Sequence, residues 1–194
     1  MKLSTKPARR WLAAILITLA AISPSMAYED LKFNYSVASP QDWLVVKLVP
    51  QVPGIYRFGW MSPSSLKDRS GANVLNFVQL LDNTVPVPEL LSKNAAAARK
   101  AGLKVVKEQV VSQGGVQGFV METSGMGNGY TLQWKNALGE PRQNVKTDNI
   151  PTRQRFFALV KGKQIVALMS TCSETTYNTY APVFNKIEKT LVLK

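Results

Sequence analysis

The sequence predicts an α+β fold, in which two helices pack on a mainly antiparallel sheet. Three observations favour this fold class. Short apolar stretches rich in β-branched and aromatic residues recur between turns that contain Pro or Gly, as in antiparallel strands. Only two segments, residues 85–102 and 173–194, have helical periodicity, and they do not alternate regularly with the strands. No internal repeat or linker divides the chain, so we expect a single domain over residues 28–194.

Residues 1–27 have the three parts of a secretory signal peptide. An apolar stretch, residues 11–22, is too short to span a bilayer comfortably and is followed by small residues suited to cleavage after Ala27. Basic residues precede the apolar stretch: Lys2, Lys6, Arg9 and Arg10. We therefore predict ordinary Sec export to the periplasm or the cell exterior. Twin-arginine export and an uncleaved N-terminal anchor remain alternatives.

The first half of the mature chain is expected to form strands. The segments are residues 28–37, 43–49, 55–61 and 73–81. Large side chains alternate in two of them, which is typical of strands with one buried face. These side chains are Phe33, Tyr35 and Val37 in the first segment, and Tyr56, Phe58 and Trp60 in the third. The polar residues 62–71 are expected to form a loop.

Residues 85–102 carry the start and stop signals of a helix. Pro88 suits the first helical position, and Glu89 lies beside the positive end of the helix dipole. Gly102 suits the position just after the last turn, where a left-handed backbone is common. An alanine-rich run between them supports the helix intrinsically.

The middle of the chain predicts a strand pair, one further strand and a long connection. Residues 103–111 and 116–123 pair around a Gly-Gly turn, and residues 130–134 alternate as a strand. The glycine-rich residues 124–129 lack the Lys-Ser/Thr of a phosphate-binding loop and favour a hairpin loop. Residues 135–152 are expected to form a long polar connection.

The C-terminal part has the strongest apolar patterning in the chain. Residues 156–160 and 164–172 predict a hairpin in the centre of the sheet, because neither segment alternates cleanly. Ser173 suits the N-cap of a helix. Five large side chains then recur at helical spacing: Tyr177, Tyr180, Phe184, Ile187 and Leu191. Pro182 predicts either a kink or a short first turn with the main helix restarting there.

Two stretches, taken with the order of the elements, carry a family resemblance. They are Phe33, Tyr35, Val37, Pro40 and Trp43; and Phe157, Leu159, Val160, Gly162, Leu168, Thr171, Cys172, Tyr177, Tyr180, Pro182, Phe184, Ile187 and Leu191. In these stretches the chain resembles the Mog1/PsbP-like superfamily, and within it the bacterial exported proteins of the DcrB type. The resemblance implies an α/β/α sandwich around an antiparallel sheet. It implies no activity, because members of the superfamily serve as adaptors, chaperones and accessory subunits, and fold alone does not give function.

The composition limits the kinds of catalytic and metal-binding site that the chain can form. The chain contains no histidine, which removes the usual general base and the commonest metal ligand, so we expect no catalytic triad, metal or cofactor. The single cysteine, Cys172, cannot form an internal disulfide and lies far from the cleavage site, which excludes lipoprotein acylation. At a strand–helix junction, Cys172 is either a reactive thiol or, as we favour, a small buried residue. An enzyme using a carboxylate such as Glu122 remains an alternative.

The net charge of +12 includes four basic residues of the signal peptide, which leaves +8 on the mature domain. This surplus favours an acidic partner, and the alternative is a charge that only keeps the protein soluble. Export makes nucleic acid an unlikely target, which leaves an acidic protein surface, anionic lipid or lipopolysaccharide. The long connection and the residues after it are rich in basic side chains. We hypothesise that four of them form part of a partner-binding surface: Arg142, Lys146, Arg153 and Arg155. The alternative is a solvated basic loop that binds no partner.

We therefore predict a periplasmic, non-enzymatic binding or accessory protein that engages a protein or an anionic envelope component. Three alternatives remain open: an immunity or inhibitor protein against a toxin or hydrolase, a binder of anionic lipid or lipopolysaccharide, and an enzyme with an unrecognised site. The oligomeric state and the identity of the partner do not follow from the sequence.

Overall fold

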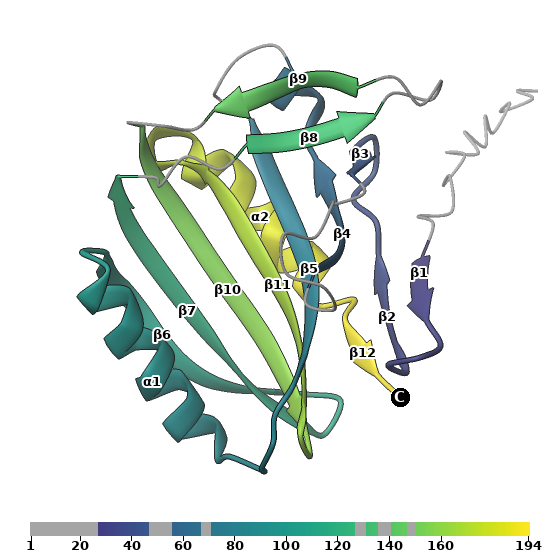
Figure 1. The fold of residues 1–194 in the computed structure, drawn as a ribbon, viewed down its shortest axis with the longest axis vertical. Helices are drawn as coiled ribbons and strands as arrows, with labels where there is room; N and C mark the ends of the chain where they lie inside the picture. The colour runs from purple at the N-terminus through teal and green to yellow at the C-terminus, as the bar shows by residue number, and fades with distance from the viewer. Residues whose placement is uncertain (1–26, 47–55, 67–70, 127–130, 136–140, 147–149) are drawn as a thin grey trace, which may run out of the picture.

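A seven-stranded antiparallel sheet with one helix on each face forms the centre of the computed structural model (Figure 1). The structure describes residues 27–46, 56–66, 71–126, 131–135, 141–146 and 150–194. The strand order is β3-β4-β5-β11-β10-β7-β6. In chain order the strands are β3 (Leu44–Val46), β4 (Tyr56–Met61), β5 (Ala72–Leu80), β6 (Lys104–Gln113), β7 (Val116–Met126), β10 (Pro151–Lys161) and β11 (Gln164–Ser173). The helices are α1 (Val87–Lys100) and α2 (Tyr177–Glu188), so the predicted fold class is confirmed.

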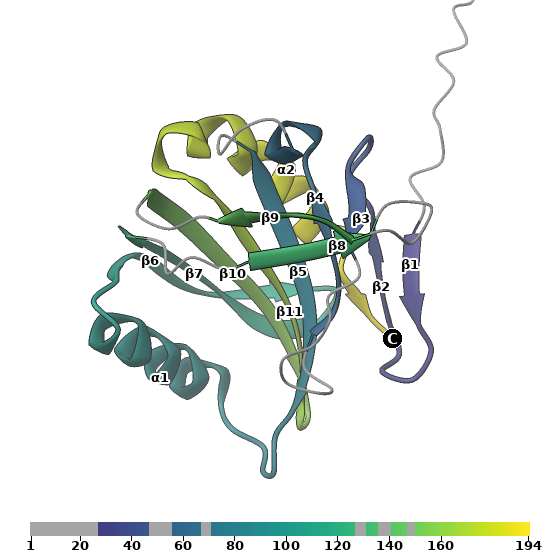
Figure 2. The same ribbon diagram turned by 45° about the horizontal axis from the view of Figure 1, so that its top comes forward.

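Two small sheets complete the described structure. The first joins β1 (Ala27–Asp30), β2 (Tyr35–Ala38) and β12 (Val192–Leu193), so the two ends of the described chain lie in one sheet. The second is a hairpin of β8 (Thr131–Lys135) and β9 (Pro141–Lys146), which passes in front of β5 in both Figure 1 and Figure 2. A short 3-10 helix, η1 (Pro63–Leu66), lies within the predicted loop before β5.

The first predicted strand, residues 28–37, is wrong as a single element, because β1 and β2 form a hairpin there. A carboxylate oxygen of Asp30 accepts hydrogen bonds from the backbone N–H groups of Lys32 and Phe33, which closes the turn. Asn34 adopts a positive φ of 52°, a conformation that asparagine tolerates well. The alternation of large side chains continues across this turn and conceals it in the sequence.

The predicted connection over residues 135–152 is also wrong, because β9 pairs with β8 inside it. Its polar composition hides the strand, since strand patterning depends mainly on apolar residues. The predicted strand over residues 43–49 corresponds to β3 as far as Val46, and residues 47–49 lie outside the described residues. Phe58 and Trp60 are buried as expected, whereas the side chain of Tyr56 lies outside the described residues.

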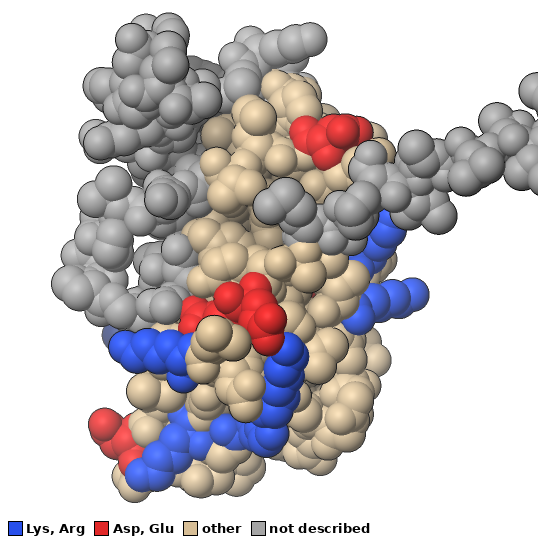
Figure 3. All heavy atoms as spheres, turned by 90° about the vertical axis from the view of Figure 1, so that its right-hand side faces the viewer, with Lys and Arg blue, Asp and Glu red and all other residues tan. Residues whose placement is uncertain are grey.

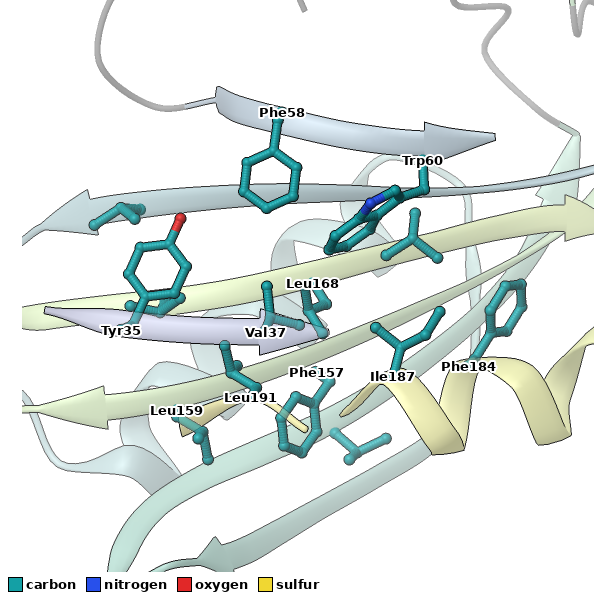
Figure 4. Close-up of a cluster of buried hydrophobic side chains, with 14 of the residues drawn as sticks. Tyr35, Val37, Phe58, Trp60, Phe157, Leu159, Leu168, Phe184, Ile187 and Leu191 are labelled. Carbon is teal, nitrogen blue, oxygen red and sulfur yellow. The ribbon is translucent and has the colours of Figure 1, made fainter. Parts of the chain in front are cut away.

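The larger core lies between the sheet and α2 (Figure 4). Residues alternate along β10, so Phe157 and Leu159 face α2 while Ala158 faces α1. Trp60, Phe184 and Leu191 are among the fully buried side chains of this core. Phe58 and Trp60 meet edge to face, with ring centroids 4.7 Å apart. Two of the five residues of the predicted helical stripe, Tyr177 and Tyr180, are only partly buried against it.

The smaller core lies on the opposite face, under α1. Leu90 and Leu91 of α1 pack against Phe119 of β7 and Ala158 of β10. The helix ends in a Schellman motif, because Leu103 N–H donates to Ala98 O and Gly102 N–H to Arg99 O, each at 3.0 Å. Gly102 has a φ of 80°, which confirms its predicted place after the last turn.

The C-terminal hairpin occupies the centre of the sheet, as predicted, with β10 and β11 paired from Thr152–Ser173 to Lys161–Gln164. Ser173 caps a short 3-10 helix, η2 (Glu174–Thr176), by accepting a hydrogen bond from Thr176 N–H. The main helix starts at Tyr177 and continues through Pro182, so a restart at Pro182 is wrong. None of the described helices is long and apolar enough to cross a membrane.

Candidate binding groove along α2

A groove of about 450 Å³ lies between the connection from β2 to β3 and the outer side of α2. Its lining is mostly apolar: Ala38, Ser39, Pro40, Gln41, Trp43, Pro182, Val183, Lys186, Ile187 and Thr190. The two walls are joined where the backbone N–H of Ala38 donates to Thr190 Oγ1 at 2.9 Å. A groove of this volume, apolar with a few polar groups, is typical of a ligand-binding site.

Trp43 forms one wall of the groove and is held in place from α2. Its ring meets that of Tyr180 edge to face, with centroids 6.0 Å apart. The Tyr180 hydroxyl lies 2.6 Å from Ser64 Oγ, which lies 3.0 Å from Ser62 Oγ. Asp42, just before Trp43, has a positive φ of 61°. These contacts hold Trp43 and Tyr180 in position at the groove.

Lys186 is the one charged residue of the groove lining, and it is exposed. It forms no ion pair with any residue that the structure describes. Most lysines with described side chains likewise form none; the exceptions are Lys93, which pairs with Glu89 at 2.6 Å, and Lys194, which pairs with Glu29. The groove thus combines an apolar surface with an unpaired positive charge.

A buried cluster of charged side chains lies between the sheet and α2. Arg155 on β10 donates from Nη1 to Glu122 Oε1 at 2.6 Å and from Nε to Glu188 Oε1 at 2.7 Å. Arg153 on the same strand donates to Glu122 Oε2 and to Glu174 Oε1, both at 3.1 Å. These pairs link β7, β10, η2 and the end of α2. The cluster therefore connects α2 to the sheet at both ends of the helix.

The ionisation of the cluster follows from burial and from these contacts. Burial alone would raise the pKa of Glu122, but hydrogen bonds from Tyr177 and Arg153 and the charge of Arg155 outweigh it and lower that pKa. Burial raises the pKa of Glu188, only partly opposed by Arg155. Burial would lower the pKa of Arg155, but Glu188 and Glu122 raise it further above its ordinary value, so Arg155 stays charged.

Basic and acidic side chains occur together on the surface. Figure 3 shows the side on which β1 and β2 lie, with lysine and arginine side chains projecting from it and smaller groups of acidic ones among them. One contact there is an ion pair between Lys194 and Glu29. Among the described residues, no group of three or more Cys, Asp or Glu side chains could hold a metal ion.

Comparison with solved structures finds a similar fold at low sequence identity. Cyanobacterial PsbP (CyanoP) from Synechocystis sp. PCC 6803 matches with a TM-score of 0.59 and 11% identity, over 92% of this chain and 99% of that one. The chain has a PsbP-like fold. LpqN, involved in cell envelope biogenesis of Mycobacterium tuberculosis, matches with a TM-score of 0.54 and 11% identity, over 89% of this chain and 86% of that one. No protein-family model and no curated protein matches the sequence.

The fold separates the four basic residues that the sequence grouped as a binding surface. Arg155 is buried and Arg153 nearly so, and both guanidinium groups are engaged by carboxylates inside the fold. Arg142 and Lys146 lie on β9, opposite Trp134 and Thr131 of β8, and their side chains are outside the described part. The sequence held a signal for the burial of the two arginines. Arg153 and Arg155 precede Phe157 at intervals of two residues, so all three lie on the same face of β10.

Cys172 is buried, as expected, with 3% of its surface exposed. Burial raises the pKa of its thiol to about 12, so the thiolate is scarce at neutral pH. The groove along α2, in contrast, was not predicted from the sequence. Its walls come from segments more than a hundred residues apart, and only Pro40 and Trp43, as a turn followed by a large aromatic residue, gave a local hint.

Proposed function

We propose that this chain is an exported, non-enzymatic binding or accessory protein that holds a partner in the groove along α2. The observation that carries the proposal is the groove itself, because its aromatic wall is held in position by Tyr180. A preformed apolar groove with few polar groups favours binding without a large ordering cost. The partner is a protein or an anionic component of the cell envelope.

Two features support binding rather than catalysis. The sequence has no histidine, so proton transfer near neutral pH would have to use another group. Glu122, the carboxylate considered for an enzyme, is engaged by both Arg153 and Arg155. These contacts lower its pKa and leave little of its surface accessible to a substrate.

Export is proposed from the N-terminal sequence. Residues 1–27 have the composition of a signal peptide with cleavage after Ala27, which leads to the periplasm or the cell exterior. The mature domain would then be residues 28–194. Assignment to the exported, DcrB-type branch of the PsbP-like proteins is part of this proposal and rests on the quoted sequence stretches.

A second candidate function is the binding of anionic lipid or lipopolysaccharide at the membrane surface. The excess of basic residues favours it, as does the unpaired Lys186 at the apolar groove. Arg142 and Lys146 are candidates for a further electrostatic contact with either kind of partner. Exchange of both for Glu should then weaken binding and reduce its dependence on salt.

Affinity capture tests the proposal. Immobilised residues 28–194 would be incubated with envelope extract, and retained proteins identified by mass spectrometry. We expect a protein retained by the wild type and by Lys93→Ala, a surface control on α1, but lost with Trp43→Ala. Retention that is the same for all three would refute the groove as the binding site. Salt-sensitive binding to phosphatidylglycerol vesicles without a protein partner would favour the second candidate.

A further inference from the structure

We infer that the groove and the adjoining edge of β3 together bind an extended segment of a partner polypeptide that carries an apolar side chain and a carboxylate. This inference rests on the proposed function and specifies the chemistry of the partner. Three observations carry it: an open strand edge, an apolar groove continuous with that edge, and an unpaired lysine at the groove.

The edge of β3 offers backbone groups to a partner. β3 is the last strand of the seven-stranded sheet, and among the described strands it pairs only with β4. Its side chains are exposed, with Leu44 at 39% and Val45 at 68%. An open edge with exposed apolar side chains can pair with an extended segment through main-chain hydrogen bonds.

The groove adjoins this edge directly. Trp43, which forms a wall of the groove, is the residue before Leu44, so a segment running along β3 would pass over the groove next. Pro182, Val183 and Ile187 offer an apolar surface on the opposite wall. Because side chains of an extended segment alternate, one of them would enter the groove while the backbone follows the edge.

Lys186 sets the charge of the ligand. Its ammonium group has no carboxylate partner among the described residues, although it lies at an apolar surface. An acidic side chain or a C-terminal carboxylate would pair with it. The other groove residues introduce no negative charge, since the lining contains neither Asp nor Glu.

The strand edge favours a polypeptide over a lipid. An acyl chain could fill the apolar groove and its head group could meet Lys186, but an acyl chain has no N–H or C=O groups for the edge of β3. Only a polypeptide segment uses all three features at once.

Selection from a random peptide library tests the inference. A phage-displayed library of random dodecapeptides would be selected on immobilised residues 28–194, and in parallel on Lys186→Glu and Lys189→Glu. Lys189 is also exposed at the end of α2 but does not line the groove, so its exchange makes the same charge change outside the site. Thermal unfolding of each variant would verify that the fold is kept.

We expect the wild type and Lys189→Glu to enrich peptides with an acidic residue near an apolar one. Peptides selected on Lys186→Glu should lack this acidic residue. A peptide enriched on the wild type should bind to Lys186→Glu at least tenfold more weakly. Val45→Ser, at the exposed edge, should weaken the same peptide without altering its preference for an acidic residue. No enrichment, or enrichment of the same sequences by Lys186→Glu, would overturn the inference.

The result separates this inference from the function on which it rests. If Trp43→Ala abolishes capture of an envelope protein but the library shows no Lys186-dependent preference, the groove binds a partner of different chemistry and only the inference fails. If no variant changes capture, the proposed function fails as well. Binding of phosphatidylglycerol vesicles that is lost in Lys186→Glu, without any peptide enrichment, would assign the groove to lipid and contradict the inference.

Discussion

Arg155 and Glu188 form a buried bidentate ion pair, with Nε and Nη2 of the arginine 2.7 and 2.8 Å from the two carboxylate oxygens. The pair joins a central strand of the sheet to the end of α2. Because α2 also forms one wall of the groove, this pair helps to fix the position of that wall.

Removal of Arg155 should destabilise the fold strongly. Arg155→Met leaves the buried carboxylates of Glu122 and Glu188 without their shared partner, and an uncompensated buried charge costs about 3–5 kcal/mol. Glu188→Gln should cost less than half as much, because Gln is neutral and Arg155 keeps its contact with Glu122. Urea unfolding measures both, and equal losses would contradict the central role of Arg155.

The contribution of Glu122 should depend on pH. Its pKa in the folded protein lies below the ordinary value of 4.5, because the contacts with Tyr177, Arg153 and Arg155 outweigh its burial. Its stabilisation is therefore complete above pH 4.5 and is lost as the pH falls through the folded pKa. We expect the difference in free energy of unfolding between wild type and Glu122→Gln to be constant near neutral pH and to shrink in acid. A difference that grows in acid would disprove the assignment.

Two glycines of β7 should respond differently to substitution by alanine. A Cβ at Gly118 would lie 2.0 Å from the backbone oxygen of Ala158 on the neighbouring strand, which cannot move without disturbing the central hairpin. A Cβ at Gly125 would meet Cδ2 of Leu103 at 2.7 Å, the end of a side chain that can rotate. We expect Gly118→Ala to cost more than the roughly 1–3 kcal/mol typical of overpacking, and Gly125→Ala to cost less. Thermal melts of the two variants compare them directly.

Cys172 should react slowly in the native protein. It is buried at the junction of β11 and η2, and burial raises the pKa of its thiol to about 12. A maleimide reagent should label it in urea but only over the timescale of unfolding in buffer. Rapid stoichiometric labelling without denaturant would show instead that the thiol is accessible.

Much of the fold follows from local signals. The helix α1 and its end were predictable because Pro88 lies in its first turn, one residue after its start at Val87, Gly102 follows its last turn, and the alanine-rich run supports it. The central hairpin was predictable because its two segments are apolar on both faces. The turn at Asn34 was not, since alternation of Phe33, Tyr35 and Val37 continues through it.

The candidate site depends on contacts that no local pattern encodes. The groove exists because the turn before Trp43 packs on α2, and sequence periodicity says nothing about where two elements meet. The charged cluster has the same origin. Arg153 and Arg155 were grouped with the basic residues of the preceding connection as a partner-binding surface, although their carboxylate partners come from other elements of the fold. Their spacing of two residues from each other and from Phe157 could have indicated that they share its buried face. The carboxylates that pair with them are visible only in the tertiary structure.

Site-specific photo-crosslinking in living cells tests the central claim most directly, that a partner binds in the groove along α2. A photoreactive amino acid would replace Gln41, which lines the groove, or Lys93, which is exposed on α1. We predict an adduct of one defined mass from position 41, lost when Trp43 is replaced by Ala, and none from position 93. Absence of an adduct at position 41, or the same adducts from both positions, would contradict the account.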